Sequence, residues 1–193
     1  MVDMKKILIA STNKNKVKEI REMLKGKYEV LSLEDLNCDV DVKEDAYTFI
    51  ENAIIKAKAY YEMTKIPVIA DDSGLSIAYF NDLPGVHSAR FYKNYNYFER
   101  NTKILEIMKD IKDRTAHYTC AMVYYDGEGA KSFIGEVYGE IGQKIAGTNG
   151  FGYDPIFYYP PLGKTFAEIS AEEKHKVSHR GIALRKLVEY LEA

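Results

Sequence analysis

Hydrophobic residues follow two spacings along this chain, one typical of buried strands and one typical of amphipathic helices. A short apolar run at residues 6–10 predicts a strand that is buried on both faces, and residues 28–33 and 67–70 also predict strands. Residues 117–125 and 131–141 predict two longer strands around an Asp-Gly turn, as in a β-hairpin. The middle of the chain is therefore expected to be rich in strands.

Four segments place apolar residues at helical spacing. One follows Ser11-Thr12-Asn13, whose side chains suit a helix N-cap, and the others span Thr48 to about Thr64, span Phe98 to Ile111, and begin at Ser178. The opening order of strand, polar turn, helix and strand indicates the α/β fold class, with a mixed architecture. Because the sequence contains no repeat and no linker, we expect residues 1–193 to form a single domain.

The charge balance and the cysteines narrow the possible partners. The 193 residues carry 27 basic and 29 acidic side chains, a net charge of −2, which excludes the basic field of a duplex-binding protein. A bound polyphosphate would have to be held by a few local cations and backbone amides. Cys38 and Cys120 are not at metal-ligand spacing, and no run approaches the roughly 20 apolar residues of a membrane span. We therefore expect a cytoplasmic protein with no nucleic-acid or membrane partner.

The first candidate site lies between the first predicted strand and helix, at residues 11–16. Backbone amides and the helix dipole favour an anion at such a junction, and the side chains of Ser11, Thr12, Asn13 and Lys16 add donors for phosphate oxygens. The segment lacks the glycines of a Walker loop. An ordinary capped helix with surface lysines is the alternative interpretation.

Carboxylates that suit a metal follow in two places. Asp71 and Asp72 come after the predicted strand 67–70, so we expect them in the turn at its carboxyl end, where ligands usually bind in α/β sheets. Adjacent strand side chains point to opposite faces, so only one of the two need hold Mg²⁺ or orient water. Glu44 and Asp45, in an acidic loop, are candidates for a second oxygen ligand. In the alternative interpretation, Asp71 and Asp72 are ordinary turn residues, and Glu44 and Asp45 are solvated acids of a surface loop.

Lys56 lies on or beside the apolar stripe of its predicted helix, between Ala53 and Tyr60. A buried ammonium is costly unless an anion meets it. The sequence leaves two interpretations open: an anion-binding lysine, or a lysine whose stem packs while its charge reaches water.

Two later segments offer groups that suit a planar base. Gly150–Pro155 combines glycines, which let backbone approach a ligand, with the aromatic faces of Phe151 and Tyr153. Further on, His179 and Arg180 stand in the first turn of the last predicted helix, where cations oppose the dipole and so indicate a local anion or an electron-rich oxygen. A packed Gly/Pro turn and a surface His-Arg pair are the alternatives.

Taken together, these segments resemble the inosine triphosphate pyrophosphatase family, which acts on non-canonical purine nucleoside triphosphates. Matching segments run nearly from end to end: residues 11–16, Thr48–Ala53, Ala70–Leu75, Pro84-Gly85, Ser88–Arg90, 150–157, Glu173-Lys174 and Ser178–Gly181. Two departures are Ser11-Thr12, where many members have Thr-Gly, and His87, where many have Tyr.

The resemblance implies an elongated α/β fold with a long mixed sheet and two lobes around a central cleft. It implies a homodimer that uses Mg²⁺ and hydrolyses ITP, dITP and XTP to the monophosphate and pyrophosphate. The triphosphate would be held by Ser11, Thr12, Asn13, Lys14, Asn15, Lys16 and Lys56. Glu44 and Asp72 would bind Mg²⁺, Asp72 would also act as the catalytic base, and Ser73 would contact the substrate nearby. The base would be bracketed by Phe151, Gly152, Tyr153 and Asp154 and read by Lys174, His179 and Arg180.

Substrate chemistry agrees with this interpretation, because the 6-oxo group of hypoxanthine and xanthine accepts a hydrogen bond from Arg180, whereas adenine offers an amino donor there. Three alternatives stay open. A related Maf-type pyrophosphatase would act on pyrimidine or modified triphosphates, and a sensor would bind nucleotides without turnover. A nucleic-acid-binding protein would show binding that weakens steeply with salt.

Overall fold

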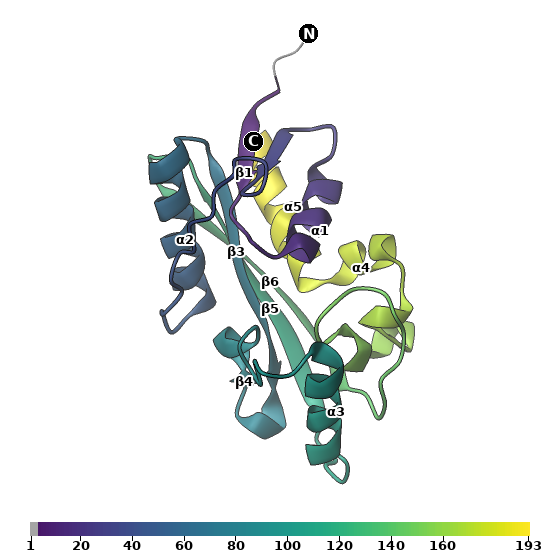
Figure 1. Cartoon of the computed structure of the whole chain (residues 1–193). Coiled ribbons are helices and arrows are strands. Elements are labelled where there is room, and N and C mark those ends of the chain that lie inside the picture. Colours follow the sequence, from purple (N-terminus) through teal and green to yellow (C-terminus); the bar gives the residue numbers. More distant parts are fainter. Residues whose placement is uncertain (1–3) are drawn as a thin grey trace. The chain divides into compact units, whose positions relative to one another are not determined.

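The computed structural model describes residues 4–193, in which an eight-stranded mixed sheet is combined with five α-helices (Figure 1). The helices are α1 (Lys14–Leu24), α2 (Phe49–Thr64), α3 (Tyr97–Ile107), α4 (Ala171–Val177) and α5 (His179–Glu192). The strands are β1 (Lys6–Ile9), β2 (Glu29–Ser32), β3 (Val68–Ile77), β4 (Leu83–Pro84), β5 (Thr115–Tyr125), β6 (Ala130–Ile141), β7 (Phe157–Tyr159) and β8 (Lys164–Thr165). The predicted α/β class is confirmed.

The strand order is β2-β1-β3-β5-β6-β7-β8, and β4 pairs with β3. β1 runs parallel to both β2 and β3, whereas the pairs β3–β4, β6–β7 and β7–β8 are antiparallel. The described residues divide into two compact units. Unit 1 contains the chain up to Asp72, residues 120–135 and residues from 183 onward; unit 2 contains residues 73–119 and 136–182. β3, β5, β6 and α5 each contribute residues to both units.

In unit 1, helices cover both faces of the sheet because its strands alternate their apolar side chains. Ile7, Ile9 and Ile69 pack with α1 and α5, while Leu8 and Val68 pack with α2 on the opposite face. Such burial on both faces explains why these strands read as continuous apolar runs. Asn13 caps α1 and Thr48 caps α2, each accepting a backbone hydrogen bond in the first turn.

Unit 2 is built around one apolar cluster rich in aromatic residues. Ile104 and Met108 join it from α3 and from the turn that follows, and Phe157 and Phe166 join it from β7 and the short 3₁₀ helix after β8. Both phenylalanines are fully buried. This cluster supports the loops and helix ends of unit 2 that carry its candidate functional groups.

The structure corrects the sequence interpretation in the middle of the chain. The strand predicted at 67–70 does not end in a turn at Asp71 and Asp72; β3 continues to Ile77, and both carboxylates lie inside the strand. Asp, Ser and Gly are poor strand formers, but the position of β3 between β1 and β5 and the burial of its residues outweigh that preference. The helix predicted to reach Ile111 ends at Ile107 instead.

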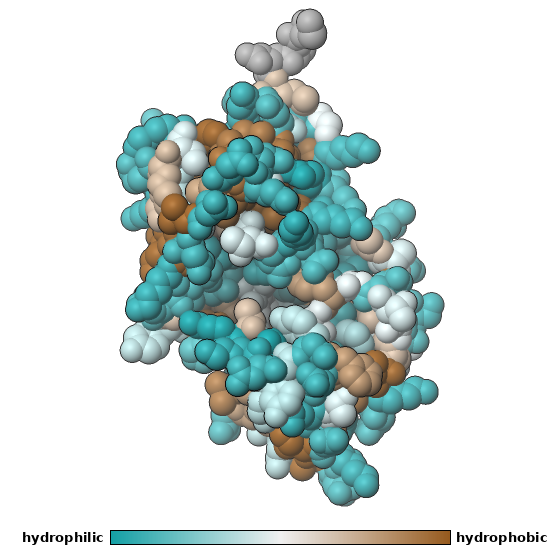
Figure 2. Space-filling view, viewed as in Figure 1, coloured by the Kyte–Doolittle hydropathy of each residue, from teal (hydrophilic) through white to brown (hydrophobic). Residues whose placement is uncertain are grey.

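The surface shows no apolar region of unusual extent on the face drawn in Figure 2, where hydrophilic residues dominate and apolar residues form small patches. Isolated exposed apolar residues are normal in folded proteins. Among residues 4–193, no helix has the length and apolar character needed to cross a membrane.

Candidate active site

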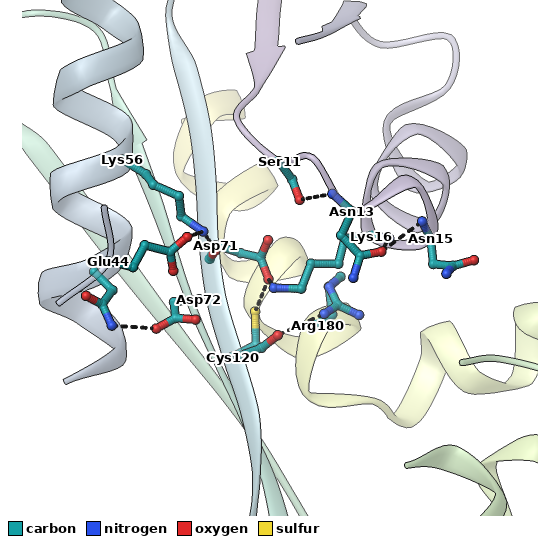
Figure 3. A network of polar contacts seen from close by, with 12 residues as sticks. Ser11, Asn13, Asn15, Lys16, Glu44, Lys56, Asp71, Asp72, Cys120 and Arg180 are labelled. Atoms are coloured by element: carbon teal, nitrogen blue, oxygen red, sulfur yellow. Dashed lines mark hydrogen bonds and ion pairs between the residues drawn. The ribbon is translucent and has the colours of Figure 1, made fainter. Parts of the chain in front are cut away.

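Two adjacent carboxylates of β3 point to opposite faces of the unit 1 sheet and meet different partners (Figure 3). Asp71 lies on the α1 face, where its Oδ2 is 3.1 Å from the Lys16 ammonium. Asp72 lies on the α2 face, where its Oδ2 accepts a hydrogen bond from Asn52 Nδ2 at 3.0 Å. Both residues are buried. The alternation of strand side chains thus divides the two acids between two clusters.

Lys56 connects these clusters from α2. Its ammonium donates to the Asp71 backbone carbonyl at 2.6 Å and lies 3.0 Å from Glu44 Oε1. Burial lowers the pKa of Lys56, but the negative charges of Asp71 and Glu44 outweigh that effect, and the pKa is raised. Lys56 is therefore a buried ammonium met by anionic groups of the chain, which excludes the interpretation in which its charge reaches water; its role in binding an anionic ligand stays a prediction.

The acidic groups around Asp72 suit a divalent cation. The pKa of Asp72 is raised, mainly because the carboxyl is buried. The charges of Lys16 and Lys56 and the Asn52 hydrogen bond act in the opposite direction, and the charge of Glu44 adds to the increase. A cation beside Asp72 and Glu44 would stabilise the charged carboxylates and so offset the effects of burial and of their mutual repulsion. In the described residues, no three His, Cys, Asp or Glu side chains gather as a metal site. Two carboxylates fit Mg²⁺, which usually takes one or two together with phosphate and water.

In the loop before α1, the side chains of Ser11 and Asn13 accept hydrogen bonds from backbone N–H groups at the N-terminus of the helix. Asn13 Oδ1 accepts from the backbone N–H groups of Asn15 and Lys16 at 3.0 and 3.2 Å, and Ser11 Oγ accepts from Asn13 N–H at 3.1 Å. Ser11, Thr12 and Lys14 line a cavity of about 850 Å³ bounded by α1 and by residues of the 28–39 segment. The two lysines of this loop and helix start differ in environment: Lys16 pairs with the buried Asp71, whereas Lys14 is largely exposed.

In unit 2, the Gly150–Asp154 loop is shaped by two glycines on either side of Phe151. Gly150 and Gly152 adopt φ values of +68° and +65°, which L side chains rarely adopt. A Cβ on Gly150 would also come within 2.2 Å of Asp154 Oδ2. Asn101 of α3 donates to the Gly152 carbonyl at 3.0 Å and so ties the loop to α3.

Asp154 is a buried anchor for this loop. Its Oδ2 accepts from the Phe151 backbone N–H at 3.0 Å and from the Lys174 ammonium at 2.7 Å, and its Oδ1 accepts from the Tyr118 hydroxyl at 3.1 Å. The Lys174 ammonium also lies 4.8 Å from the centre of the Phe151 ring. One carboxylate therefore links the loop, β5 and α4.

The junction of α4 and α5 presents His179 and Arg180. Ser178 Oγ accepts from Gly181 N–H at 3.0 Å, as an N-cap does. The His179 ring stacks on Tyr118, and Arg180 donates to Ser73 Oγ at 3.0 Å while its guanidinium lies 5.7 Å from the Phe151 ring centre. These cationic and aromatic side chains form a cluster that suits an electron-rich planar ligand.

Comparisons with known proteins show the family of the chain. A family model described as the Ham1 family matches residues 7–190. The chain belongs to the Ham1 family. A relative from Clostridium perfringens is 44% identical, covering 97% of this chain and 98% of its own, and one from Bacillus subtilis is 43% identical over the full length of both. Both are named dITP/XTP pyrophosphatase.

Solved Ham1 structures share the fold. The Ham1 protein of Staphylococcus aureus is 39% identical with a TM-score of 0.87, covering 97% of this chain and 98% of its own. A Ham1 protein from Coxiella burnetii is 40% identical with a TM-score of 0.89, covering 98% of this chain and 100% of its own. Identities near 40% over nearly whole chains place this chain within the Ham1 family at the level of both sequence and fold.

For this Ham1 chain, the structure brings most of the predicted residues into two groups, one in each unit. Unit 1 holds the loop 11–16, Lys56, Glu44 and Asp72; unit 2 holds Ser73, Phe151 to Asp154, Lys174, His179 and Arg180. Asp45 forms an ion pair with Lys43, whose ammonium lies 2.9 Å from Asp45 Oδ2. The roles of these residues remain predictions.

Sequence reasoning gave no role to two side chains that organise these groups, Asn52 and Tyr118, and it considered Asp71 only as a metal ligand or a turn residue. Asn52 orients Asp72, Asp71 anchors Lys16, and Tyr118 contacts both Asp154 and His179. Asn52 falls on the same helix face as Lys56, four residues away, and that spacing was a usable signal. Tyr118 lies in an apolar strand and gave no signal, because its role depends on which loops reach it.

Proposed function

We propose that this protein is a Mg²⁺-dependent nucleoside triphosphate pyrophosphatase that converts ITP, dITP and XTP to the monophosphate and pyrophosphate. The observation that carries the proposal is the unit 1 cluster, in which Lys16 and Lys56 are held by Asp71 and Glu44 beside the buried Asp72. Ammonium groups for phosphates next to a carboxylate pair for a metal are what such a reaction needs. The names of the Ham1 relatives support the substrate class.

The two lysines supply preorganised charge for the triphosphate. Lys16 is tied to Asp71 Oδ2, and Lys56 is tied to the Asp71 carbonyl and to Glu44. Because these contacts already fix the ammonium groups, little reorganisation is needed when phosphate oxygens approach. The raised pKa of Lys56 keeps its charge at every working pH.

Mg²⁺ would be held by Glu44 and Asp72, with phosphate and water oxygens completing its shell. When bound, the ion neutralises phosphate charge and polarises the α-phosphate toward attack. Among the residues of this chain, Asn52 fixes the Asp72 carboxylate through Oδ2. This contact keeps the carboxylate in one orientation for both metal binding and proton transfer.

The hydrolysis step uses Asp72 as the general base. A water oxygen forms a bond to the α-phosphorus as the bond to the bridging oxygen breaks, and pyrophosphate leaves on the opposite side. The water proton passes to Asp72. General-base help of this kind is usually worth about 10²–10⁴ in rate.

The unit 2 cluster would recognise the base. Phe151, displayed between two glycines of positive φ, offers a ring for stacking, and stacking contributes on the order of 1–3 kcal/mol per base. Arg180 is oriented by Ser73 and would donate to the 6-oxo group. Adenine has an amino donor at this position, which would face the donors of the guanidinium, so adenine would be rejected.

We further propose that the two units are the lobes of one domain, that the protein is a homodimer, and that it works in the cytoplasm, as the resemblance to pyrophosphatases implies. Three strands pass from unit 1 to unit 2, which supports a single domain. Sedimentation velocity at several protein concentrations tests the dimer, and a monomer throughout would contradict it.

Product analysis tests the function. Purified protein is incubated with Mg²⁺ and, separately, with ITP, XTP, GTP, ATP and dTTP. Monophosphate and pyrophosphate from ITP and XTP, with the others slow, is the expected result. Diphosphate and orthophosphate would mean that a different bond is cleaved, and binding of ITP without turnover would favour a sensor. Preferred cleavage of dTTP would favour a Maf-type activity.

A further inference from the structure

Tyr118 of β5 is the buried side chain on which the separate parts of the unit 2 cluster meet. Its residue is 6% exposed, and its ring lies flat against the His179 imidazole, with centroids 4.5 Å apart and planes 9° apart. On its other sides the ring contacts Phe157 and Phe166, whose centroids are 4.5 and 6.0 Å away. These three neighbouring rings hold the Tyr118 ring in one position, so the His179 imidazole stacked on it is held in one plane.

The hydroxyl of the same residue contacts the loop that displays Phe151. It donates to Asp154 Oδ1 at 3.1 Å, while Asp154 Oδ2 accepts from Lys174 and from the Phe151 backbone N–H. Three donors on two oxygens define the orientation of the carboxylate, and through it the start of the loop. Burial, reinforced by the Asp154 charge, raises the pKa of Tyr118 well above its ordinary value, so the hydroxyl remains a donor.

We propose that Tyr118 is a positioning residue for purine recognition, which sets the plane of His179 by stacking and holds Asp154 so that Phe151 and Lys174 stay in place. The inference rests on the proposed function, because it assigns Tyr118 to the base-binding half of that site. It differs from a general structural role in one measurable way: the contacts of Tyr118 described above all lie in unit 2, and the phosphate cluster lies in unit 1.

Two substitutions separate the hydroxyl from the ring. Tyr118→Phe keeps the ring on His179 and removes one of the three donors to Asp154. Tyr118→Leu removes the stacking surface as well and leaves a smaller apolar side chain in the core. The matched control is Tyr124→Phe, six residues further along β5, where the ring contacts Tyr190 within unit 1.

For Tyr118→Phe, KM for ITP should rise about tenfold with kcat within about twofold, since one hydrogen bond to a buried carboxylate is lost. Tyr118→Leu should raise KM further and reduce the preference for ITP over ATP, because His179 is no longer confined. Tyr124→Phe should match the wild type. Far-UV circular dichroism and the urea midpoint establish that each variant is folded under the assay conditions.

Direct binding makes the test independent of turnover. Calorimetric titration with IMP and, separately, with pyrophosphate in the presence of Mg²⁺ measures the base end and the phosphate end of the site. Tyr118→Phe should weaken IMP binding about tenfold and leave pyrophosphate binding within twofold of the wild type. A matching rise in KM for ITP would support the assignment.

Several results would overturn the inference. An unchanged KM and unchanged IMP binding in Tyr118→Phe would show that the hydroxyl positions nothing of importance. Equal weakening of IMP and pyrophosphate would show a general structural role. If the wild type binds IMP but cleaves neither ITP nor XTP, the proposed function fails while the IMP comparison still decides the role of Tyr118. A wild type that neither binds IMP nor cleaves ITP or XTP would overturn both.

Discussion

The buried ion pair between Asp154 and Lys174 allows a quantitative test of how unit 2 is held together. The two side chains are only 3% and 4% exposed, and the Lys174 ammonium lies 2.7 Å from Asp154 Oδ2. Asp154→Asn keeps the size of the side chain but removes its charge, which leaves the ammonium buried beside a neutral amide. Removing one partner of such a pair typically costs about 3–5 kcal/mol.

The reciprocal substitution, Lys174→Met, should cost a similar amount because it leaves the carboxylate buried with only its Phe151 and Tyr118 donors. In the double variant neither charge is buried, so its loss of stability should be smaller than the sum of the two single losses by about 2–4 kcal/mol. The total free energy of unfolding of a domain is only about 5–15 kcal/mol, so losses of this size are a large fraction of it and are readily measured.

Urea unfolding measures these differences, followed by far-UV circular dichroism and by the fluorescence of the 16 tyrosines, since the chain has no tryptophan. The two signals must coincide for a two-state treatment, which a chain of two compact units has to demonstrate. The control is the pair Lys27–Glu192, nearly as short at 2.8 Å but about half exposed, for which Lys27→Met should cost under about 1 kcal/mol. Strictly additive losses at Asp154 and Lys174, or losses as small as the control, would refute the reasoning.

Three further predictions concern separate features. Asp72→Asn should lower turnover of ITP at least 10²-fold while the urea midpoint shows an intact fold, because it removes the general base that we propose. Gly181→Ala should destabilise the protein and raise KM for ITP, since the added Cβ would lie 1.9 Å from the His175 carbonyl oxygen and force the α4–α5 junction apart; paired stability and KM measurements check this. Asp35→Asn should lower stability slightly at pH 7, because hydrogen bonds from Ser32 hold the pKa of Asp35 below its ordinary value of 3.8.

The pH dependence of the last effect has a definite sign. A carboxyl whose pKa is lowered by folding contributes stability above its unfolded pKa, and loses that contribution as the pH falls through its folded pKa. The difference between wild type and Asp35→Asn should therefore be constant near neutrality and shrink below about pH 4. A difference that grows toward acid pH would contradict this account. Near-normal turnover by Asp72→Asn would remove that residue from the mechanism, and unchanged stability of Gly181→Ala would show that the junction adjusts freely.

The sequence alone determined the elements whose local signals agree with their environment. The segments 6–10 and 28–33 were predicted as strands and contain β1 and β2, and Asn13 and Thr48 stand before apolar stripes and cap α1 and α2. Short motifs that suit phosphate or a planar base were also readable in the sequence, and the roles of their residues stay predictions.

Other elements were decided by tertiary structure against local preference. β3 continues through Asp71 and Asp72 because it lies inside the sheet, between β1 and β5, where these residues are buried despite their preference for turns. The short helix α4 was missed, although Ser170 and Glu173 form a capping box that was readable in the sequence.

The pairing of side chains within each unit could be settled only by the fold. Lys56 was ambiguous until Glu44 and the Asp71 carbonyl were found around its ammonium, because burial alone would have disfavoured the charge. Tyr118 looked like any core aromatic until the fold placed Asp154 at its hydroxyl and His179 on its ring. A sequence records which groups are present, but the energy of a buried polar group depends on partners that are remote in the chain, and only the folded structure brings these together.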